Sequence, residues 1–378
     1  EDGIRLENGN VRTYKESVDH QLVSSIANLK TLQKHSKAIY QDFVKNRLMH
    51  VDKSSIYAER SYVVLPTDNT SRLTKLLELL DIQGIVYQVT TKATDVKNAK
   101  NHLGQTLAKT TIPVGAIVIN NLQYDAPLIA TILEFDAKIS DAVLLEERQK
   151  TLRDGSSVMY DTTAWNITMM YGLAALEVPE KLTKNLADYQ YNKSGLVKRD
   201  KTIAYLVDGQ NDASVGFAAR LLEQNVQVRI LDKKAQFNDI HFNRGSVLVY
   251  NYDNPQFVNN KQLETLVEQA ALETKTQAIS ISEGLGDGDL PDIGGSHVRL
   301  LKKPQLAFIT QAGINPNELG SMWHLVDTEL GIRHSHLSQD LFSGMDLRQY
   351  NVLVVPPRYY GELSESNVKQ LDVWVKNG

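Results

Sequence analysis

The chain has 378 residues, of which 42% are hydrophobic and 23% are charged, a composition typical of a folded protein with two or three domains. Its formal net charge of -4 and the lack of a long basic stripe exclude the electrostatic pattern of a nucleic-acid-binding protein. No apolar run approaches the ~18 residues of a membrane span. Cysteine is absent, which excludes disulfides, a thiolate nucleophile and thiolate zinc sites.

Residues 1–60 form a polar and helical N-terminal segment. The sequence Glu-Asn-Gly-Asn at 7–10 predicts a hairpin turn. Residues 14–47 follow as one long helix, or as two helices joined near Lys34–Ser36. One side of this pattern is apolar and carries Val18, Leu22, Ile26, Leu29, Leu32, Ile39 and Phe43. Because the other side is polar, we expect a helical strut that packs across the domains.

One order of elements then occurs three times: strand, polar loop, helix, strand. The strands and helices of the copies read SYVVLP, RLTKLLELLDIQGI and VYQVTT; TIAYLV, SVGFAARLLEQN and VQVRILDK; QLAFIT, ELGSMWHLVDTELGI and RHSHLS. Each copy continues into a further strand (AIVINN, SVLVYN or NVLVVP) and a helix, at 127–134, 260–273 or 364–376. This self-similarity predicts an α/β fold of repeated flavodoxin- or amidotransferase-like β-α-β modules with parallel sheets. The predicted modules are 61–200, 201–300 and 301–378, the last one truncated.

The first module carries an insertion rich in aromatic residues and methionine. Residues 159–178 read MYDTTAWNITMMYGLAALEV. This stretch is either a helix buried between domains, which we favour, or the lining of a groove for an apolar ligand. Residues 189–200 are polar and read as the linker into the second module.

The nine histidines do not form the motif of a zinc peptidase, because none of them begins a His-x-x-Glu sequence. The nearest match, His324-Leu-Val-Asp327, lies within an amphipathic helix and is expected to pack or cap there. His334 and His336 should point to the same side of a strand, but two ligands alone make only a weak metal site. The sequence therefore predicts no metal site in this chain.

An acidic, glycine-rich stretch at 283–292 contains Asp287, Asp289 and Asp292. Their spacing departs from that of a calcium-binding loop, and no Glu follows where it would close the coordination shell. We therefore expect a solvated connecting loop.

Two loops that follow predicted strands are candidate ligand-binding rims, because α/β folds bind ligands at this edge. The first contains Asp208 and Asp212, and the second contains Arg358, Tyr359 and Tyr360. Neither has the G-x-G-x-x-G spacing of a dinucleotide loop, and the chain has no G-x-S-x-G nucleophile motif. We predict binding residues here, and no catalytic residue.

Five segments, taken in order, resemble the C-terminal half of large bacterial zinc carboxypeptidases of the carboxypeptidase A family. They read LENGN…SVDHQLVSSIANLKTLQKH, MYDTTAWNITMMYGL, GLGDGDLPDIGGSHVRLLKKPQLAFIT, GSMWHLVDTELGI and DLRQYNVLVVP…LDVWVKNG. The last two are similar to the start of the amidotransferase-like final domain of that family. The cysteine nucleophile of class I glutamine amidotransferases would lie beyond this point.

The resemblance implies that the zinc ligands and the general base lie in a peptidase domain that precedes this chain, so that zinc is a cofactor of that domain and not of this segment. Glu1 does not match the base, and no catalytic residue of the family falls on a position of this sequence. The expected function is an accessory, scaffolding region of a periplasmic or secreted metallocarboxypeptidase, itself without catalysis. Its expected partners are the parent's own peptidase domain and a peptide substrate. The alternative is a module that binds peptides or cell-wall fragments.

Overall fold

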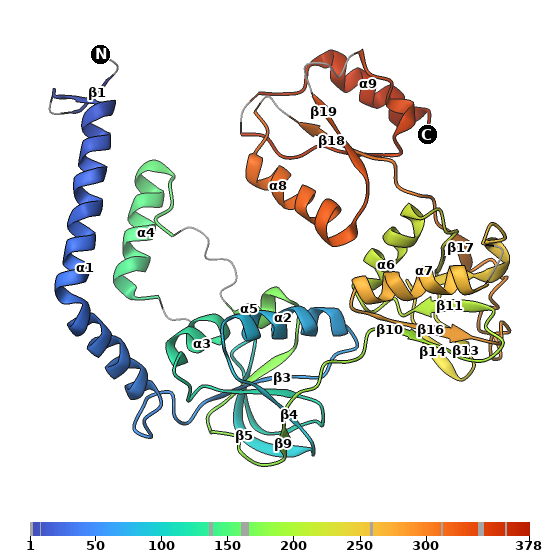
Figure 1. Cartoon of the computed structure of the whole chain (residues 1–378), viewed down its shortest axis with the longest axis horizontal. Helices are drawn as coiled ribbons and strands as arrows, with labels where there is room; N and C mark the ends of the chain where they lie inside the picture. The colour runs from blue at the N-terminus through green and yellow to red at the C-terminus, as the bar shows by residue number, and fades with distance from the viewer. Residues whose placement is uncertain are drawn as a thin grey trace. The chain divides into compact units, whose positions relative to one another are not determined.

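The computed structural model describes residues 3–7, 9–135, 139–159, 166–257, 260–310, 313–338, 344–359 and 361–378. The chain folds into two compact units. The first comprises Glu1–Pro66 and Glu78–Tyr189, and the second comprises Thr67–Leu77 and Gln190–Gly378. Helices and several sheets alternate along the chain, and some strand pairs are parallel, so the mixed α/β class is confirmed (Figure 1). None of the helices in the described ranges combines the length and apolarity needed to cross a membrane.

The N-terminal segment is a hairpin followed by one continuous helix. Strands β1 (Gly3–Arg5) and β2 (Val11–Thr13) pair antiparallel, which confirms the predicted turn. Helix α1 (Tyr14–His50) has 37 residues and begins at a capping box in which the Thr13 side chain and Glu16 bond to each other's backbone. No residue of α1 is buried. The helix is therefore present as predicted, without the packing expected of a strut.

The first unit contains a seven-stranded sheet with the order β6-β5-β8-β3-β7-β4-β9. Its strands are β3 (Ser61–Val64), β4 (Gln88–Thr90), β5 (Thr94–Asn101), β6 (Thr106–Ile112), β7 (Ile117–Asn120), β8 (Ala175–Val178) and β9 (Leu186–Ala187). The helices are α2 (Thr70–Ile82), whose first turns belong to the second unit, α3 (Ala126–Leu133), α4 (Asp141–Asp154) and α5 (Ile167–Met170).

The second unit contains a six-stranded sheet with the order β10-β16-β11-β15-β12-β17. Its strands are β10 (Gly195–Val197), β11 (Ala204–Val207), β12 (Arg229–Leu231), β15 (Val247–Tyr250), β16 (Gln277–Ile281) and β17 (Val298–Leu300). A separate hairpin is formed by β13 (Ala235–Phe237) and β14 (Ile240–Phe242). The helices are α6 (Ala213–Glu223), α7 (Asn260–Glu273) and the 3-10 helix η1 (Asn251–Asp253).

These two sheets share one topology and one register. The order β8-β3-β7-β4 in the first sheet corresponds to β16-β11-β15-β12 in the second. Tyr62 pairs with Ile119 as Tyr205 pairs with Val249, and both tyrosines are buried. The self-similarity of the first two copies in the sequence is thus matched strand for strand.

The prediction of parallel strands is wrong for most of both sheets. β3 and β4 run in the same direction, as a β-α-β unit requires, but β7 lies between them and is antiparallel to both. The second sheet repeats this arrangement, and β10–β16 is its one parallel pair among the described residues. Consequently the first two modules are not flavodoxin-like in strand direction.

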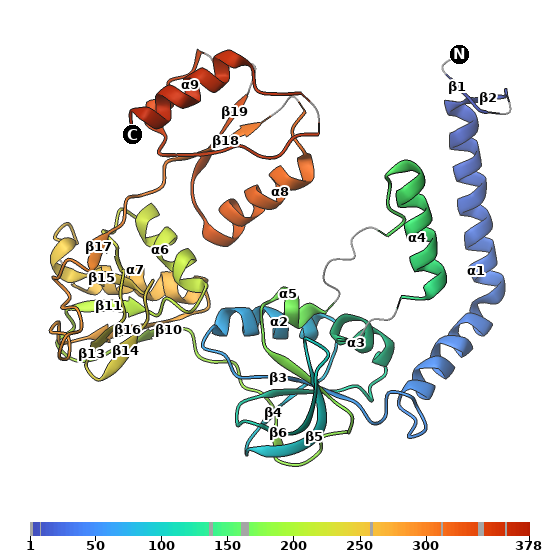
Figure 2. The same ribbon diagram turned by 180° about the vertical axis from the view of Figure 1, so that it is seen from behind.

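A hairpin missed by the sequence analysis, formed by β13 and β14, lies in the chain between β12 and the antiparallel β15 (Figure 2). In the second unit it turns at Asn238 and Asp239, which both have positive φ, the geometry of a type I′ turn. Phe237 and Phe242 of this hairpin join one core with strand residues such as Leu206. Helices α6 and α7 contribute to the core on the opposite face (Figure 1). Because a hairpin covers one face, no second layer of helices is needed there.

The third module is parallel, as predicted. β18 (Leu306–Thr310) pairs in parallel with β19 (His334–Ser338) and with β20 (Val352–Val354). Side chains of β18 alternate between two cores, with Phe308 in one and Ile309 in the other. The helical elements are α8 (Pro316–His324), the π-helix η2 (Leu325–Leu330), the 3-10 helix η4 (Leu347–Gln349) and α9 (Glu365–Lys376), which Ser364 caps. The third copy therefore has a different strand topology from the first two.

The insertion rich in aromatic residues and methionine is not one buried helix. Residues 160–165 lie outside the described ranges. The rest forms the short helix α5 and the strand β8, and Met169 and Met170 are exposed. Asn166 and Thr168 are buried polar residues of this stretch, and Asn166 Nδ2 donates to Leu133 O over 2.6 Å. The stretch therefore helps to build the first sheet.

Gly209, which follows β11, lies very close to the backbone of Gly245 and Ser246, and a substitution tests this close approach. A Cβ atom at this position would lie 2.2 Å from the backbone carbon of Gly245 and 2.4 Å from Ser246 N. Gly209→Ala should therefore lower the free energy of unfolding by about 1–3 kcal/mol, because backbone must move. The matched control is Gly294→Ala, since nothing lies within 4 Å of its Cβ position. Equal urea midpoints for the two variants would contradict the close approach.

Candidate functional site

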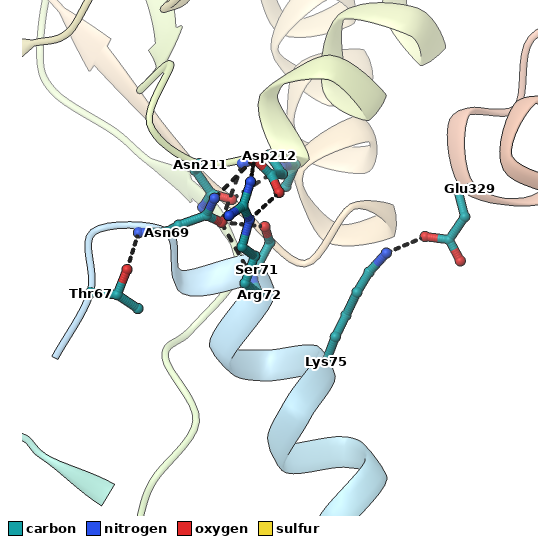
Figure 3. Close-up of polar contacts among 9 residues, drawn as sticks. Thr67, Asn69, Ser71, Arg72, Lys75, Asn211, Asp212 and Glu329 are labelled. Atoms are coloured by element: carbon teal, nitrogen blue, oxygen red, sulfur yellow. Dashed lines mark hydrogen bonds and ion pairs between the residues drawn. The ribbon is translucent and has the colours of Figure 1, made fainter. Parts of the chain in front are cut away.

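Asp212, a predicted binding residue, lies at the start of α6 and is engaged by the start of α2. Arg72 Nε donates to Asp212 Oδ2 over 2.6 Å, and Arg72 Nη2 donates to Oδ1 over 3.3 Å. Asn69 Nδ2 donates to the same Oδ1 over 2.9 Å. Figure 3 shows these side chains converging within the second unit. The carboxylate is therefore occupied by partners from its own chain.

Arg72 and Asp212 form a partly exposed ion pair, which we call the clamp. The hydrogen bond from Arg72 lowers the pKa of Asp212 below its ordinary value, and the same bond raises the pKa of Arg72. Both side chains remain partly exposed, at 55% for Asp212 and 42% for Arg72, so water screens the attraction. The arrangement stabilises a contact modestly and leaves no unpaired charge for a ligand.

Asn211 was not predicted and is the buried member of the cluster. Its Nδ2 donates to Thr70 Oγ1 over 2.9 Å and lies 3.3 Å from Thr276 Oγ1. Its Oδ1 accepts from Ala213 N over 3.1 Å. The sequence did carry a signal, because Asn-Thr-Ser at 69–71 and Asn-Asp-Ala-Ser at 211–214 are both typical of helix starts.

Farther along α2, a second ionic contact joins the same helix to the π-helix. Lys75 Nζ pairs with a carboxylate oxygen of Glu329 and lowers the pKa of that residue (Figure 3). Arg220 of α6 donates through Nη1 to the backbone oxygens of Glu329 and Leu330, over 3.0 and 3.2 Å. These bonds satisfy carbonyl groups at the end of the π-helix, which is a structural role.

Asp208, the other predicted residue of this rim, also has a structural role. Its Oδ2 accepts from Asn243 N over 2.9 Å, and its Oδ1 accepts from Gln210 N over 2.8 Å. The Asn243 side chain donates to both carboxylate oxygens over 3.2 Å. Asp208 therefore holds its own loop against the turn that precedes β15.

The second predicted rim is formed where β18 and β20 end. Arg358 forms an antiparallel bridge with Ile314, and Tyr359 N donates to Gly313 O over 2.8 Å. Arg358 Nε donates to Gly361 O over 3.0 Å. The Tyr359 side chain is 62% exposed. Tyr360 lies outside the described residues. This rim belongs to the three-stranded sheet, whereas Asp208 and Asp212 follow a strand of the six-stranded sheet, so the predicted residues lie at the edges of two different sheets.

His334 and His336 lie on one side of β19, as predicted, with ring centroids 5.3 Å apart. His336 also packs edge-on against Trp323, at 5.1 Å. Burial lowers the pKa of His336, which favours the neutral ring. Both rings also contact Phe308, so they belong to an aromatic cluster.

Among the residues that the structure describes, no group of three or more His, Cys, Asp or Glu side chains is arranged to hold a metal ion. In the acidic loop, Asp292 Oδ1 accepts a hydrogen bond from Gly286 N over 2.7 Å. One of the three aspartates of that loop thus shapes its turn.

A large concave surface lies on α1 and was not predicted. We call it the α1 groove. It has a volume of about 1210 Å³ and is mostly apolar. Its walls are formed by Lys37, Tyr40, Gln41, Val44, Lys45, Leu48, Met49, His50, Asp52, Ser54, Ser55, Ile56 and Tyr57. The end of α1 beside it is held by Arg47, which pairs with Asp125 at 2.5 Å. The sequence did carry a signal for this groove, because α1 has apolar residues such as Val44 and Leu48 that are not on the apolar side predicted from the sequence.

No protein-family model matches the chain, and neither a curated protein nor a solved structure is similar to it.

The clamp around Asp212 can be measured by a double-mutant cycle of Arg72→Ala and Asp212→Ala. We expect a coupling of about 0.5–1 kcal/mol at neutral pH, because the pair is partly screened. The folded-state pKa of Asp212 is depressed, so this stability is fully present above the carboxylate's unfolded pKa and is lost as the pH falls through the folded pKa. Urea unfolding of the four chains of the cycle, at neutral pH and near pH ~2.5, would measure this loss of coupling free energy in acid.

The control for this cycle is the exposed pair Lys376–Asp372 on α9, at 2.7 Å. Its coupling should be smaller, about 0.3 kcal/mol. A coupling between Arg72 and Asp212 that does not fall in acid would rule out the ionic clamp.

Proposed function

We propose that this chain is the accessory, scaffolding region of a zinc metallocarboxypeptidase that acts in the periplasm or outside the cell. The five segments similar to that family, in their order, support the proposal. On this proposal the zinc and the groups that cleave the peptide belong to a separate peptidase domain of the same polypeptide. This region would support that domain and shape access to its active site.

The observation that carries the proposal is the α1 groove. A helix that buries none of its own residues is poorly explained by packing within this chain. The groove offers the apolar side chains of Val44, Leu48 and Ile56, with Lys37 and Lys45 at its walls. An apolar floor with charged edges is the usual anatomy of a protein interface. The peptidase domain is the partner we assign to it, and α1 would then be the strut.

The bonding of the polar rim residues favours a scaffolding function rather than a catalytic one. Asp212 is paired with Arg72, and Asp208 is bonded to Asn243. Each carboxylate therefore takes part in holding loops together. The parallel third module is consistent with the start of an amidotransferase-like domain, which is how we interpret it.

The first test measures zinc in the purified chain by elemental analysis, together with hydrolysis of a peptide substrate. We expect near-zero zinc and no hydrolysis, because the peptidase domain would supply both. One tightly bound zinc per chain, with hydrolysis of the peptide, would overturn the proposal. His334 and His336 would then be the first residues to replace.

The second test uses the intact enzyme that includes the proposed peptidase domain. Val44→Glu with Leu48→Glu places two carboxylates in the α1 groove. This double variant should lower the melting temperature of the peptidase domain, or should lower its kcat/KM several-fold. Ala27→Glu with Thr31→Glu adds the same charge to an exposed part of α1 outside the groove and should change neither. Equal effects of the two pairs would show that the groove is not the contact.

A second candidate function is peptide binding at the rim of the third module, which the exposed ring of Tyr359 favours. Such binding should be saturable and should weaken roughly 5- to 150-fold in Tyr359→Ala, because an aromatic side chain contributes about 1–3 kcal/mol at an interface. Calorimetry with a short peptide measures this. Tyr252→Ala, at a ring that is 82% exposed in the second unit, is the control. Unchanged affinity in Tyr359→Ala would exclude this rim.

A further inference from the structure

Helix α1 carries a second apolar surface, separate from the groove. We call it the α1 seam. It consists of Val18, Leu22, Ser25, Leu29, Leu32, Ser36, Ile39 and Phe43. Successive members are separated alternately by four and by three positions. This is the spacing of the core positions of a coiled coil. At 3.6 residues per turn the seam lies about 140° around the helix axis from the groove.

Within the part of the chain that the structure describes, no residue buries this seam. Its apolar members range in exposure from 44% at Ile39 to 66% at Leu29. The contiguous apolar surface exposed along the seam is larger than that of the single exposed apolar residues scattered over an ordinary helix. The positions that border it between Val18 and Phe43 are mainly uncharged; Ile26 is one of them, and Tyr40 lies between the seam and the groove. The cations Lys30, Lys34 and Lys37 lie on the outer faces of the helix instead.

We propose that the α1 seam binds the α1 seam of a second copy of this chain, as an antiparallel two-helix coiled coil. The seam has the same alternation of four and three when read from either end, so it is self-complementary under a two-fold axis. That axis crosses between Leu29 and Leu32. The paired layers are Val18 with Phe43, Leu22 with Ile39, Ser25 with Ser36, and Leu29 with Leu32, each occurring twice.

The two serines set the register. In the proposed register Ser25 faces Ser36 of the partner, and every other layer is wholly apolar. A slip of one heptad would place Ser25 against Leu29 and Ser36 against Val18. That would bury a hydroxyl group among apolar side chains in several layers, which costs free energy. A polar layer of this kind is a known determinant of coiled-coil register.

The direction is set by side-chain volume and by charge. An antiparallel pair places Phe43 opposite the small Val18, whereas a parallel pair would place Phe43 against itself. The amino end of α1 carries Glu16 and Asp19 beside Lys15, and its carboxyl end carries Lys45. Antiparallel helices bring these opposite charges together, and their macrodipoles also attract.

This inference does not rest on the proposed function, because the groove and the seam are different faces of α1. A copy bound at the seam leaves the groove free for another partner. Leu29→Glu with Leu32→Glu should therefore affect self-association only, and Val44→Glu with Leu48→Glu should leave it intact.

The experiment begins with sedimentation velocity of the full chain over about a hundredfold range of concentration, because the dimer is favoured by mass action. We expect a shift from monomer to dimer. Leu29→Glu with Leu32→Glu should abolish the dimer, since it buries four like charges at the two-fold axis. The matched pair Ala27→Glu with Thr31→Glu should dimerise as the unchanged chain does. A monomer at every concentration, or equal loss in both pairs, would overturn the proposal.

The direction is tested by cross-linking, for which a chain without cysteine is well suited. Ser25→Cys and Ser36→Cys chains, mixed and oxidised, should form a disulfide-linked heterodimer. Ser25→Cys alone should not cross-link, because its two copies would lie about 16 Å apart along an antiparallel pair, beyond disulfide reach. A disulfide-linked dimer of Ser25→Cys alone would show a parallel pair and overturn the proposal.

Discussion

Both large sheets depend on one central strand that is hydrogen-bonded along both edges. β3 lies between β7 and β8, and β11 lies between β15 and β16, with the same register in each sheet. All four residues of β3 and all four of β11 are buried. A strand buried on both faces and paired on both edges leaves its backbone no alternative partners. The helices and hairpins above and below it are positioned by this strand.

Helix α6 meets a further constraint, because it contacts two cores at once. Its Phe217 lies in the core of the second sheet, while Ala219 joins the core of the third module with Phe308. A Cβ atom at Gly216 would be only 3.3 Å from Thr274 Cγ2 and 3.5 Å from Glu329 O. Small residues on this side of the helix therefore allow the π-helix to approach. Arg220 then binds the carbonyl groups at its end.

Element types were largely predictable from the sequence, because apolar periodicity reports which face of an element is buried. The helix at 14–50 and the strand that ends at Thr310 are examples. Strand direction was not predictable from this pattern, since a buried strand reads alike in parallel and antiparallel pairs. The hairpin at Asn238 and Asp239 lies between the antiparallel strands β12 and β15, and its turn signal is only two residues long.

The rim residues illustrate a second limit of sequence reasoning. A carboxylate after a strand reads as a ligand group, yet the same position is where a helix needs its cap and a loop needs its anchor. The partners of Asp212 and Asp208 are Arg72 and Asn243, which lie far from them in the sequence. Long-range pairing of this kind leaves no periodic pattern. The sequence therefore identified the rims but not which of their polar groups were already bonded.

Helix α1 shows why exposure on a stable element carries functional information. Helix α1 has 37 residues and a capping box, and it is longer than the ~12–15 residues below which isolated helices are marginal. None of its apolar side chains is buried in the described structure. Two apolar faces on one such helix, the groove and the seam, would add only a liability to aggregate if they had no partners. Because they point in different directions, two partners can bind α1 without competing.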